Sequence, residues 1–207
     1  MPRLVVEGVS YSRGSQLIID NLSFGLAAGE LLSITGQNGI GKTTLLKLIA
    51  GLLIPEQGAI QLCHADNGQI LTPQSNHQAW LGHRNALKDT WTALENLLLL
   101  RQLRSANEFD PLKALSMVGL FKQRHQPVQT FSQGMKRRLA LASLLLTNAP
   151  LWLLDEPQNS LDKEGIALFE QMLARHLEAD GMALMASHHA LSLSTPNCRY
   201  LTLGSSS

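Results

Sequence analysis

The stretch from Gly36 to Thr44 constrains the fold of this chain more than any other part of the sequence. Its spacing, G-x-x-x-x-G-K-T, is the Walker A pattern of a phosphate-binding loop. A short apolar strand is expected before it, at 31–35, and a helix closed by glycine after it, at 45–51. Glycines let successive backbone N–H groups converge on anionic oxygens, and the helix N-terminus adds positive potential. A chance glycine-rich turn is the alternative, but strand, loop and helix together predict binding of a nucleoside triphosphate.

The side chains of this loop have distinct expected roles. Lys42 can reach the β- and γ-phosphates and neutralise charge during catalysis, while Thr43 offers a hydroxyl group to Mg²⁺. The sequence therefore predicts a nucleotide site that also holds a metal ion. We expect the phosphates to be bound along the whole loop, by Gly36, Gln37, Asn38, Gly39, Ile40, Gly41, Lys42, Thr43 and Thr44.

An apolar strand that ends in two carboxylates supplies the second half of the expected site. Residues 151–154 are apolar, and Asp155 and Glu156 follow them directly. The carboxyl edge of a parallel sheet is where ligands lie. We expect Asp155 to hold Mg²⁺, directly or through water, and Glu156 to act as the general base on the attacking water. A strand that simply ends in an acidic turn is the alternative, and the Walker A loop in the same chain argues against it.

The order of apolar segments predicts an α/β fold. Short strands with Gly, Ser and Asn turns fill residues 3–33, a further strand is expected at 58–62, and residues 64–78 are polar and irregular. From 88 to 146 the pattern is helical, with Leu94, Leu97, Leu98 and Leu100 on one expected apolar face. A helix at 163–177 and a strand at 182–186 follow. We therefore expect one domain over 1–207, with a mostly parallel sheet, an N-terminal antiparallel β subdomain and a helical subdomain inserted at about 85–145.

Composition excludes some classes of protein and partner. The net charge of +1 gives no reason to expect a nucleic-acid partner. The N-terminus lacks the apolar core of a signal peptide. The most apolar region, 139–154, is interrupted by Asn148 and Pro150 and is too short to span a bilayer. We therefore expect no direct membrane insertion, so any membrane association requires a partner. The two cysteines, Cys63 and Cys198, suggest no disulfide framework.

The segment Phe131–Ala142 carries a resemblance to a known family. It resembles the signature of the ATP-binding cassette (ABC) family, L-S-G-G-Q followed by a basic and then an apolar helix. Ser132 and Gly134 match the signature, whereas Phe131, Gln133 and Met135 depart from it. Ser132 is a typical helix N-cap, which leaves N–H groups free for an anion. The family resemblance implies that this anion is the γ-phosphate of an ATP held by a second copy, so that two cassettes form a homodimer.

The basic run Lys136-Arg137-Arg138 is compatible with a solvated helix face, and no catalytic role is expected for it.

Other parts of the chain resemble the same family. Tyr11 lies where the family places an aromatic ring that stacks on adenine, although it can equally be an ordinary strand residue. Residues 159–162 resemble the loop that communicates between the two sites. His188 resembles the switch histidine that contacts the γ-phosphate, and His189 replaces the usual Asp.

A metal site formed by His188 and His189 is a possible alternative. Adjacent side chains near a strand end point apart, however, and no third ligand is evident. The remaining histidines belong to no motif and are expected at the surface: His64, His77, His125 and His176.

The loop that enters the helical region departs from the family pattern. In the family this loop carries a glutamine that touches Mg²⁺ or the attacking water, and the equivalent position here is His83. A neutral imidazole can make one such hydrogen bond, but a protonated one would repel Mg²⁺. We therefore expect slow hydrolysis in the isolated chain.

The same loop and its surroundings narrow the resemblance. Gly82-His83, Leu87-Lys88, the stretch 92–97 and the stretch 150–165 are similar to the ATPase subunits of cytochrome c maturation exporters. This similarity implies a peripheral subunit on the cytoplasmic face of the inner membrane, bound to integral membrane subunits of a haem-maturation complex. Its ATP hydrolysis would drive haem export or delivery, or release the periplasmic haem chaperone.

Three other functions fit parts of the pattern. An ABC transporter ATPase with a different cargo would use the same chemistry. A soluble ABC protein acting on ribosomes or DNA fits less well, because this chain has one Walker A loop and only about ninety residues between Lys42 and Ser132. A P-loop kinase is disfavoured by the signature segment and by Glu156 beside Asp155.

Overall fold

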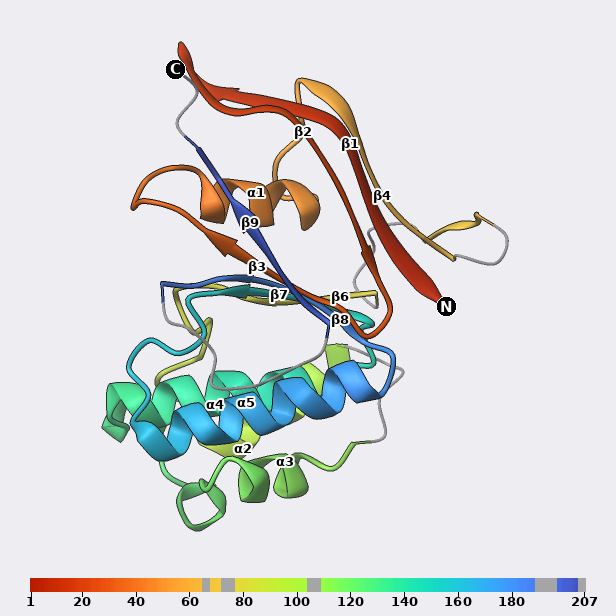
Figure 1. The fold of residues 1–207 in the computed structure, drawn as a ribbon. Helices are drawn as coiled ribbons and strands as arrows, with labels where there is room; N and C mark the ends of the chain where they lie inside the picture. Colours follow the sequence, from red (N-terminus) through yellow and green to blue (C-terminus); the bar gives the residue numbers. More distant parts are fainter. Residues whose placement is uncertain (65–67, 72–76, 104–108, 189–196, 205–207) are drawn as a thin grey trace.

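Two β-sheets and five α-helices form the described part of the chain. The computed structural model describes residues 1–64, 68–71, 77–103, 109–188 and 197–204. The helices lie in layers with the two sheets, and one helix lies between the sheets (Figure 1). This arrangement confirms the expected α/β class.

The central sheet is parallel. Its strand order is β6 (Gln78–Leu81), β7 (Leu151–Asp155), β8 (Met182–Ala186), β3 (Leu31–Thr35) and β9 (Cys198–Thr202). Each neighbouring pair in that order runs parallel. Because β3, β7 and β8 run the same way, the segments that follow them emerge at one edge of the sheet. The Walker A loop, the Asp155-Glu156 pair and His188 therefore converge there.

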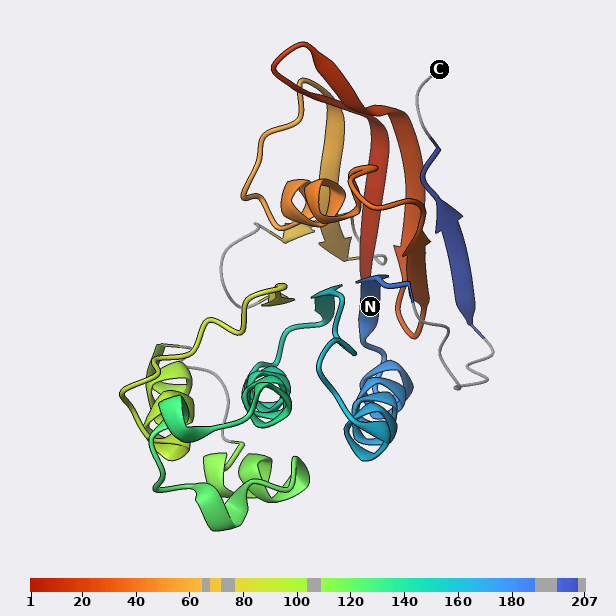
Figure 2. The same cartoon turned by 90° about the vertical axis from the view of Figure 1, so that its left-hand side faces the viewer.

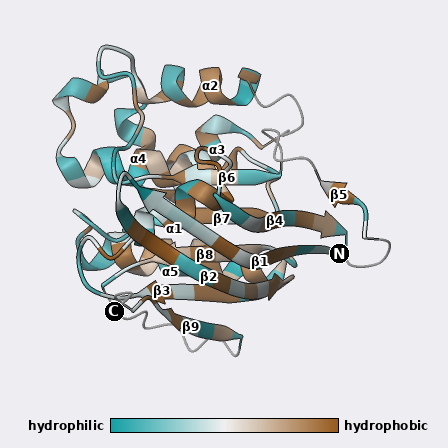
Figure 3. Cartoon of the chain, turned by 90° about the horizontal axis from the view of Figure 1, so that it is seen from above, coloured by the Kyte–Doolittle hydropathy of each residue, from teal (hydrophilic) through white to brown (hydrophobic). Residues whose placement is uncertain are grey.

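The second sheet is antiparallel and covers the N-terminal part of the molecule. Strand β1 (Pro2–Arg13) forms a hairpin with β2 (Gln16–Ala27) and pairs on its other edge with β4 (Gln57–His64). Strand β4 pairs in turn with the short β5 (Ile70–Leu71). Seen from above, this sheet crosses over the parallel strands, with β9 at one edge of the molecule and α2 and α3 toward the other (Figure 3).

Alternating side chains place a hydrophobic cluster on each face of the parallel sheet. In β8, Met182, Leu184 and Ala186 belong to the cluster that packs under the antiparallel sheet, whereas Ala183 and Met185 face the opposite cluster. All five of these residues are buried. This two-sided burial explains the continuous apolar run, since a strand covered on both faces has no polar side.

The helices divide between the two faces. Helix α1 (Lys42–Ile49) lies between the two sheets, and α4 (Gln133–Leu145) and α5 (Lys163–Glu178) cover the other face of the parallel sheet (Figures 1 and 2). Helices α2 (Ala93–Leu103) and α3 (Pro111–Met117) pack on α4, together with short 3-10 helices at Phe121–Gln123 and Val128–Thr130. The helical pattern expected from 88 to 146 thus corresponds to α2, α3 and α4. No helix in the described ranges is long and apolar enough to cross a membrane.

Two local expectations were wrong. Residues 64–78 are not irregular throughout, because β5 lies at 70–71 and β6 begins at Gln78. The four leucines of α2 do not share one face. Leu97 is buried and Leu94 and Leu100 pack on the core, but Leu98 lines an outward hollow beside Trp91. An α-helix has 3.6 residues per turn, so Leu98 shares a face of α2 with Glu95 and Gln102, which line the same hollow, rather than with its neighbour Leu97.

Candidate nucleotide site

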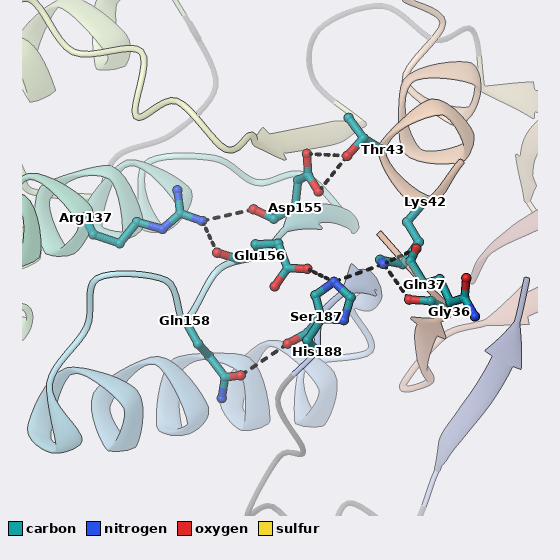
Figure 4. A network of polar contacts seen from close by, with 10 residues as sticks. All are labelled: Gly36, Gln37, Lys42, Thr43, Arg137, Asp155, Glu156, Gln158, Ser187 and His188. Carbon is teal, nitrogen blue, oxygen red and sulfur yellow. Dashed lines mark hydrogen bonds and ion pairs between the residues drawn. The ribbon is translucent and has the colours of Figure 1, made fainter. Parts of the chain in front are cut away.

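The candidate site lies where α1 begins, at the carboxyl ends of β3, β7 and β8. Figure 4 shows side chains from these elements directed toward one another. A pocket of about 310 Å³ opens at this edge. Its walls come from the Walker A loop, the β1 end, the loop after β6 and the ends of β7 and β8. The lining residues are Arg13, Asn38, Gly39, Gly41, Lys42, Thr43, Thr44, His83, Asp155, Glu156 and His188.

Two glycines allow the Walker A loop to take its shape. Gly41 precedes α1 with φ +116°, and a Cβ there would lie 2.7 Å from Cγ2 of Ile18. Gly36 has φ +143°, and its Cβ would lie 2.9 Å from the carbonyl oxygen of Leu203. Both positions therefore require a residue without a side chain. No side chain caps α1, so its first N–H groups remain available to an anion at the pocket.

Lys42 is the buried cation of the site. Its side chain is 7% exposed, and its Nζ donates to the carbonyl oxygens of Gly36, at 2.8 Å, and Gln37, at 3.1 Å. The same nitrogen lies 3.1 Å from Nε2 of His188 (Figure 4). A buried ammonium group that borders a pocket with free N–H groups is suited to an anionic ligand.

Thr43 and Asp155 meet across the interface between α1 and β7. The Thr43 hydroxyl donates to both carboxylate oxygens of Asp155, at 3.1 and 3.0 Å. Asp155 is 4% exposed. Hydroxyl and carboxylate oxygens are the hard donors that Mg²⁺ prefers, so this pair fits a magnesium ion.

Glu156 sits at a strained turn immediately after β7. Its φ is +49°, a conformation that non-glycine residues rarely adopt and that clusters at functional sites. Its backbone N–H donates to the carbonyl of Ala186 at 2.8 Å. The carboxylate Oε1 lies 3.4 Å from Nε2 of His188. His188 thus stands between the acidic Glu156 and the basic Lys42.

The placement of Tyr11 differs from that of its neighbour Arg13. Tyr11 packs against the cluster beneath the antiparallel sheet and is not among the residues that line the pocket. Arg13, two residues further along β1, lines it. The sequence reasoning did not single out Arg13. The register of β1 against β2 is irregular between Tyr11 and Ser12, so simple alternation along the strand could not have shown which residue reaches the pocket.

Ser132 and Gly134 lie apart from this pocket, at the start of α4. Ser132 is the N-cap and its Oγ accepts from the Met135 N–H at 3.2 Å. A Cβ on Gly134 would lie 3.0 Å from the carbonyl oxygen of Ser160. The expected signature therefore packs against the loop at 159–162, and Ser132 at the start of the helix is exposed and does not line the pocket.

His83 lines the pocket beside Glu156 and the Walker A residues. It lies two residues after the end of β6 and is exposed. Its neighbours Gly82 and Asn85 are held by Arg137, whose Nη1 donates to the Gly82 carbonyl at 2.8 Å and to Asn85 Oδ1 at 3.0 Å.

Arg137 corrects the expectation for the basic run. The side chain is not on a solvated face, because it is only 2% exposed. It lies three and four residues before Ala140 and Leu141, which are buried on the same side of α4. This i, i+3, i+4 spacing was the signal in the sequence. Lys136 and Arg138 do pair with exposed carboxylates, those of Asp89 and Asp162.

His176 corrects a second expectation, because it is not a surface residue. Its ring stacks on Trp152 with a centroid distance of 3.9 Å, and Nε2 lies 3.1 Å from the Met182 carbonyl. Burial lowers the pKa of His176, and hydrogen bonds to backbone carbonyls oppose that shift. His189 lies outside the described residues. Across the described ranges, no three His, Cys, Asp or Glu side chains gather as a metal site.

Comparison with known proteins agrees with this geometry. A model of the ABC transporter family matches residues 19–159. The chain is 43% identical over 192 residues to the cytochrome c biogenesis ATP-binding export protein CcmA of Nitrosococcus oceani, with 93% of this chain and 88% of that protein covered. It is 39% identical over 197 residues to the CcmA of Rhodopseudomonas palustris, with 95% and 97% covered.

A solved structure of the ATP-binding subunit of an ABC transporter superposes with a TM-score of 0.83 at 26% identity, over 98% of this chain and 86% of that one. The match to the family model contains the phosphate loop, the signature segment and the Asp155-Glu156 pair. The chain therefore belongs to the ABC transporter family of ATP-hydrolysing ATP-binding proteins and, within it, to the cytochrome c biogenesis ATP-binding export proteins.

Proposed function

We propose that this chain is the ATPase of a membrane complex for cytochrome c maturation, and that the pocket beside α1 is its catalytic site. One observation carries the catalytic assignment. A single pocket is lined by Lys42, Thr43, Asp155, Glu156 and His188, which come from separate segments of the chain. In that pocket the buried ammonium of Lys42, the Asp155 carboxylate and the Glu156 carboxylate serve phosphate, metal and water respectively.

Mg²⁺ would be held by the Thr43 hydroxyl and the Asp155 carboxylate. These two groups already meet at about 3 Å, and both are oxygen donors of the kind the ion prefers. When bound, the ion neutralises charge on the phosphates and orients them.

Hydrolysis then needs a base, a cation and an orienting group. The Glu156 carboxylate takes a proton from water as the water oxygen bonds to the γ-phosphorus. The bond from that phosphorus to the β–γ bridging oxygen breaks, leaving ADP and phosphate. Lys42 neutralises the charge that builds on the phosphate oxygens. His188 would contact the γ-phosphate and orient the water, and its distances of 3.4 Å to Glu156 and 3.1 Å to Lys42 support this role.

A second copy of the chain would complete each site. Ser132 and Gly134 do not line the chain's own pocket, and Ser132 caps a helix of 13 residues whose N-terminus suits an anion. We propose that this helix end contacts the γ-phosphate bound by the other copy. ATP then holds a homodimer together, and hydrolysis releases it.

The names of the relatives support a membrane context. Proteins named cytochrome c biogenesis ATP-binding export proteins resemble the chain along nearly its whole length. We propose a peripheral subunit on the cytoplasmic face of the inner membrane, bound to integral membrane subunits of the haem-maturation complex. Its ATP cycle would drive haem export or delivery, or release of the haem chaperone. An ABC transporter with a different cargo is the alternative.

Steady-state ATPase measurements test the catalytic assignment. Glu156→Gln should keep nucleotide binding and lose hydrolysis, because glutamine keeps the size of the side chain but cannot take a proton. Lys42→Ala should weaken both. Lys47→Ala changes an exposed lysine of the same helix and should match the wild type. Full activity in Glu156→Gln would remove Glu156 from the mechanism.

Co-purification tests the membrane assignment. The Glu156→Gln chain, tagged and held in ATP, is recovered from membranes in mild detergent, and the associated proteins are identified by mass spectrometry. Small integral membrane proteins of haem maturation should be recovered. Recovery of a different permease would keep the ATPase mechanism and discard the haem assignment.

A further inference from the structure

Arg137 lies at the centre of a buried network that none of the roles above uses. A guanidinium group has five N–H donors, and here each has an acceptor. Nε donates to the Pro157 carbonyl at 3.0 Å, and Nη2 donates to the carbonyls of Asp155 and Glu156 at 3.1 and 2.7 Å. Nη1 donates to the Gly82 carbonyl at 2.8 Å and to Asn85 Oδ1 at 3.0 Å. The side chain is therefore fully satisfied although it is 2% exposed.

The acceptors fall into two groups that lie on different elements. Three of them are the successive carbonyls of the turn after β7, in which Glu156 has φ +49°. The other two flank His83 in the loop after β6. Arg137 thus joins the turn that presents the Glu156 carboxylate to the loop that presents His83. Figure 4 shows the guanidinium reaching the first of these groups from α4.

The partners are unusual for a buried arginine, because they are neutral oxygens rather than carboxylates. Burial lowers the pKa of Arg137 to about 10, and the nearby charges of Asp155 and Glu156 oppose that shift. The group therefore stays protonated at neutral pH. A buried charge without an ion-pair partner is costly unless its hydrogen bonds are complete. Movement of either group of acceptors would therefore leave N–H donors of Arg137 unpaired and cost free energy.

We infer that Arg137 is a positioning residue for hydrolysis, which fixes the Glu156 turn and the His83 loop relative to each other. The inference rests on the proposed roles of those two residues. Arg137 does not line the pocket, and the hydrogen bonds of the Lys42 and Thr43 side chains do not involve it, so phosphate binding should not depend on Arg137. Loss of Arg137 should slow the chemical step and leave nucleotide affinity unchanged.

Arg137→Lys tests this inference with the charge retained. An ammonium group has three donors without the fixed fork of a guanidinium, so it cannot hold both groups of acceptors. A displacement of about 1 Å in a catalytic group can cost roughly 10²-fold in rate, and we expect kcat to fall by about 10- to 100-fold with KM and the nucleotide dissociation constant within about twofold of the wild type. Arg175→Lys, an exposed arginine of α5, is the matched control. A wild-type kcat in Arg137→Lys, or a rise in KM that accounts for the whole loss, overturns the inference.

Asn85→Ala tests the positioning role of Arg137 if Arg137→Lys does not fold. This change removes one acceptor from a half-buried loop residue and leaves the four carbonyl contacts of Arg137 in place. A fall in kcat of about three- to tenfold, roughly 0.7 to 1.4 kcal/mol, at unchanged nucleotide affinity supports the inference, and wild-type kcat overturns it. Glu156→Gln distinguishes failure of the positioning role of Arg137 from failure of the proposed catalytic site. If that variant is inactive while Arg137→Lys and Asn85→Ala are fully active, the positioning role fails and the proposed catalytic site stands.

Discussion

Two arginines, Arg13 and Arg137, occupy positions that their neighbouring residues in the sequence did not predict. Arg137 lies in a basic run whose pattern is compatible with a solvent-exposed helix face, yet its guanidinium is buried and donates to backbone carbonyls. Arg13 lines the candidate pocket, whereas Tyr11, the aromatic residue expected there, is partly buried and packs against the core. By contrast Lys42, Thr43, Asp155 and Glu156 are held by short motifs with fixed spacing, so the sequence located them directly. The difference is that Arg13 and Arg137 owe their positions to tertiary packing.

Arg13 and Tyr11 can be compared directly as contacts for the nucleobase. A guanidinium stacked on an aromatic base contributes on the order of 1–2 kcal/mol, which corresponds to a change of about 5- to 30-fold in binding. Since Arg13 lines the pocket, Arg13→Ala should raise KM for ATP by roughly fivefold or more and leave kcat near the wild-type value. Titration of a fluorescent ATP analogue measures the same loss without turnover.

Tyr11→Leu is the comparison for this prediction. Tyr11 packs on the core, so its replacement should lower thermal stability rather than affinity. If Tyr11→Leu weakens ATP binding and Arg13→Ala does not, the base contact belongs to Tyr11 as the family resemblance suggests.

At the scale of elements, the sequence predicted the buried strands better than those near the sheet edges. β3, β7 and β8 are continuous apolar runs because both their faces are covered. β6 is four residues long and follows a polar segment, and β9 is an edge strand with exposed Arg199 and Tyr200. Such strands gain their structure from pairing with a neighbour already in place, so their own pattern is weak.

His176 links the end of α5 to β7 and β8, and its ionisation should affect the stability of that junction. Burial lowers the pKa of His176 in the folded state, so the unfolded chain takes up the proton first as the pH falls. The neutral ring contributes full stability above the unfolded-state pKa of about 6.5. That contribution is lost as the pH falls through the lower, folded-state pKa.

The test is the melting temperature of wild type and His176→Phe between about pH 7.5 and 5. Phenylalanine keeps a ring against Trp152 but cannot be protonated, so the melting temperature of the variant should decline less steeply below about pH 6.5. His125→Phe, which changes an exposed histidine, should follow the wild-type slope. Parallel slopes for wild type and His176→Phe would contradict the assignment.

At the scale of the whole molecule, the parallel sheet acts as the common support for both halves of the site. One hydrophobic cluster fixes α1 and the antiparallel sheet against its upper face, and the other fixes α2 to α5 against its lower face. The phosphate loop therefore belongs to one layer and the signature helix α4 to the other, as Figures 1 and 2 show. Ser132 and Gly134 do not line the pocket of their own chain, and the proposed head-to-tail pair of chains would bring them to the Walker A loop of the second copy.

The mass of the Glu156→Gln chain in solution tests this central claim most directly. Light scattering after size exclusion gives the mass with ATP and Mg²⁺, with ATP and a chelator, and without nucleotide. Because the variant should bind ATP without hydrolysing it, we predict a particle of twice the 22.6 kDa chain with ATP and Mg²⁺ and a single chain in the other two conditions. Adding Lys42→Ala should abolish the dimer. A Glu156→Gln chain that binds ATP yet stays at the mass of one copy would contradict the account.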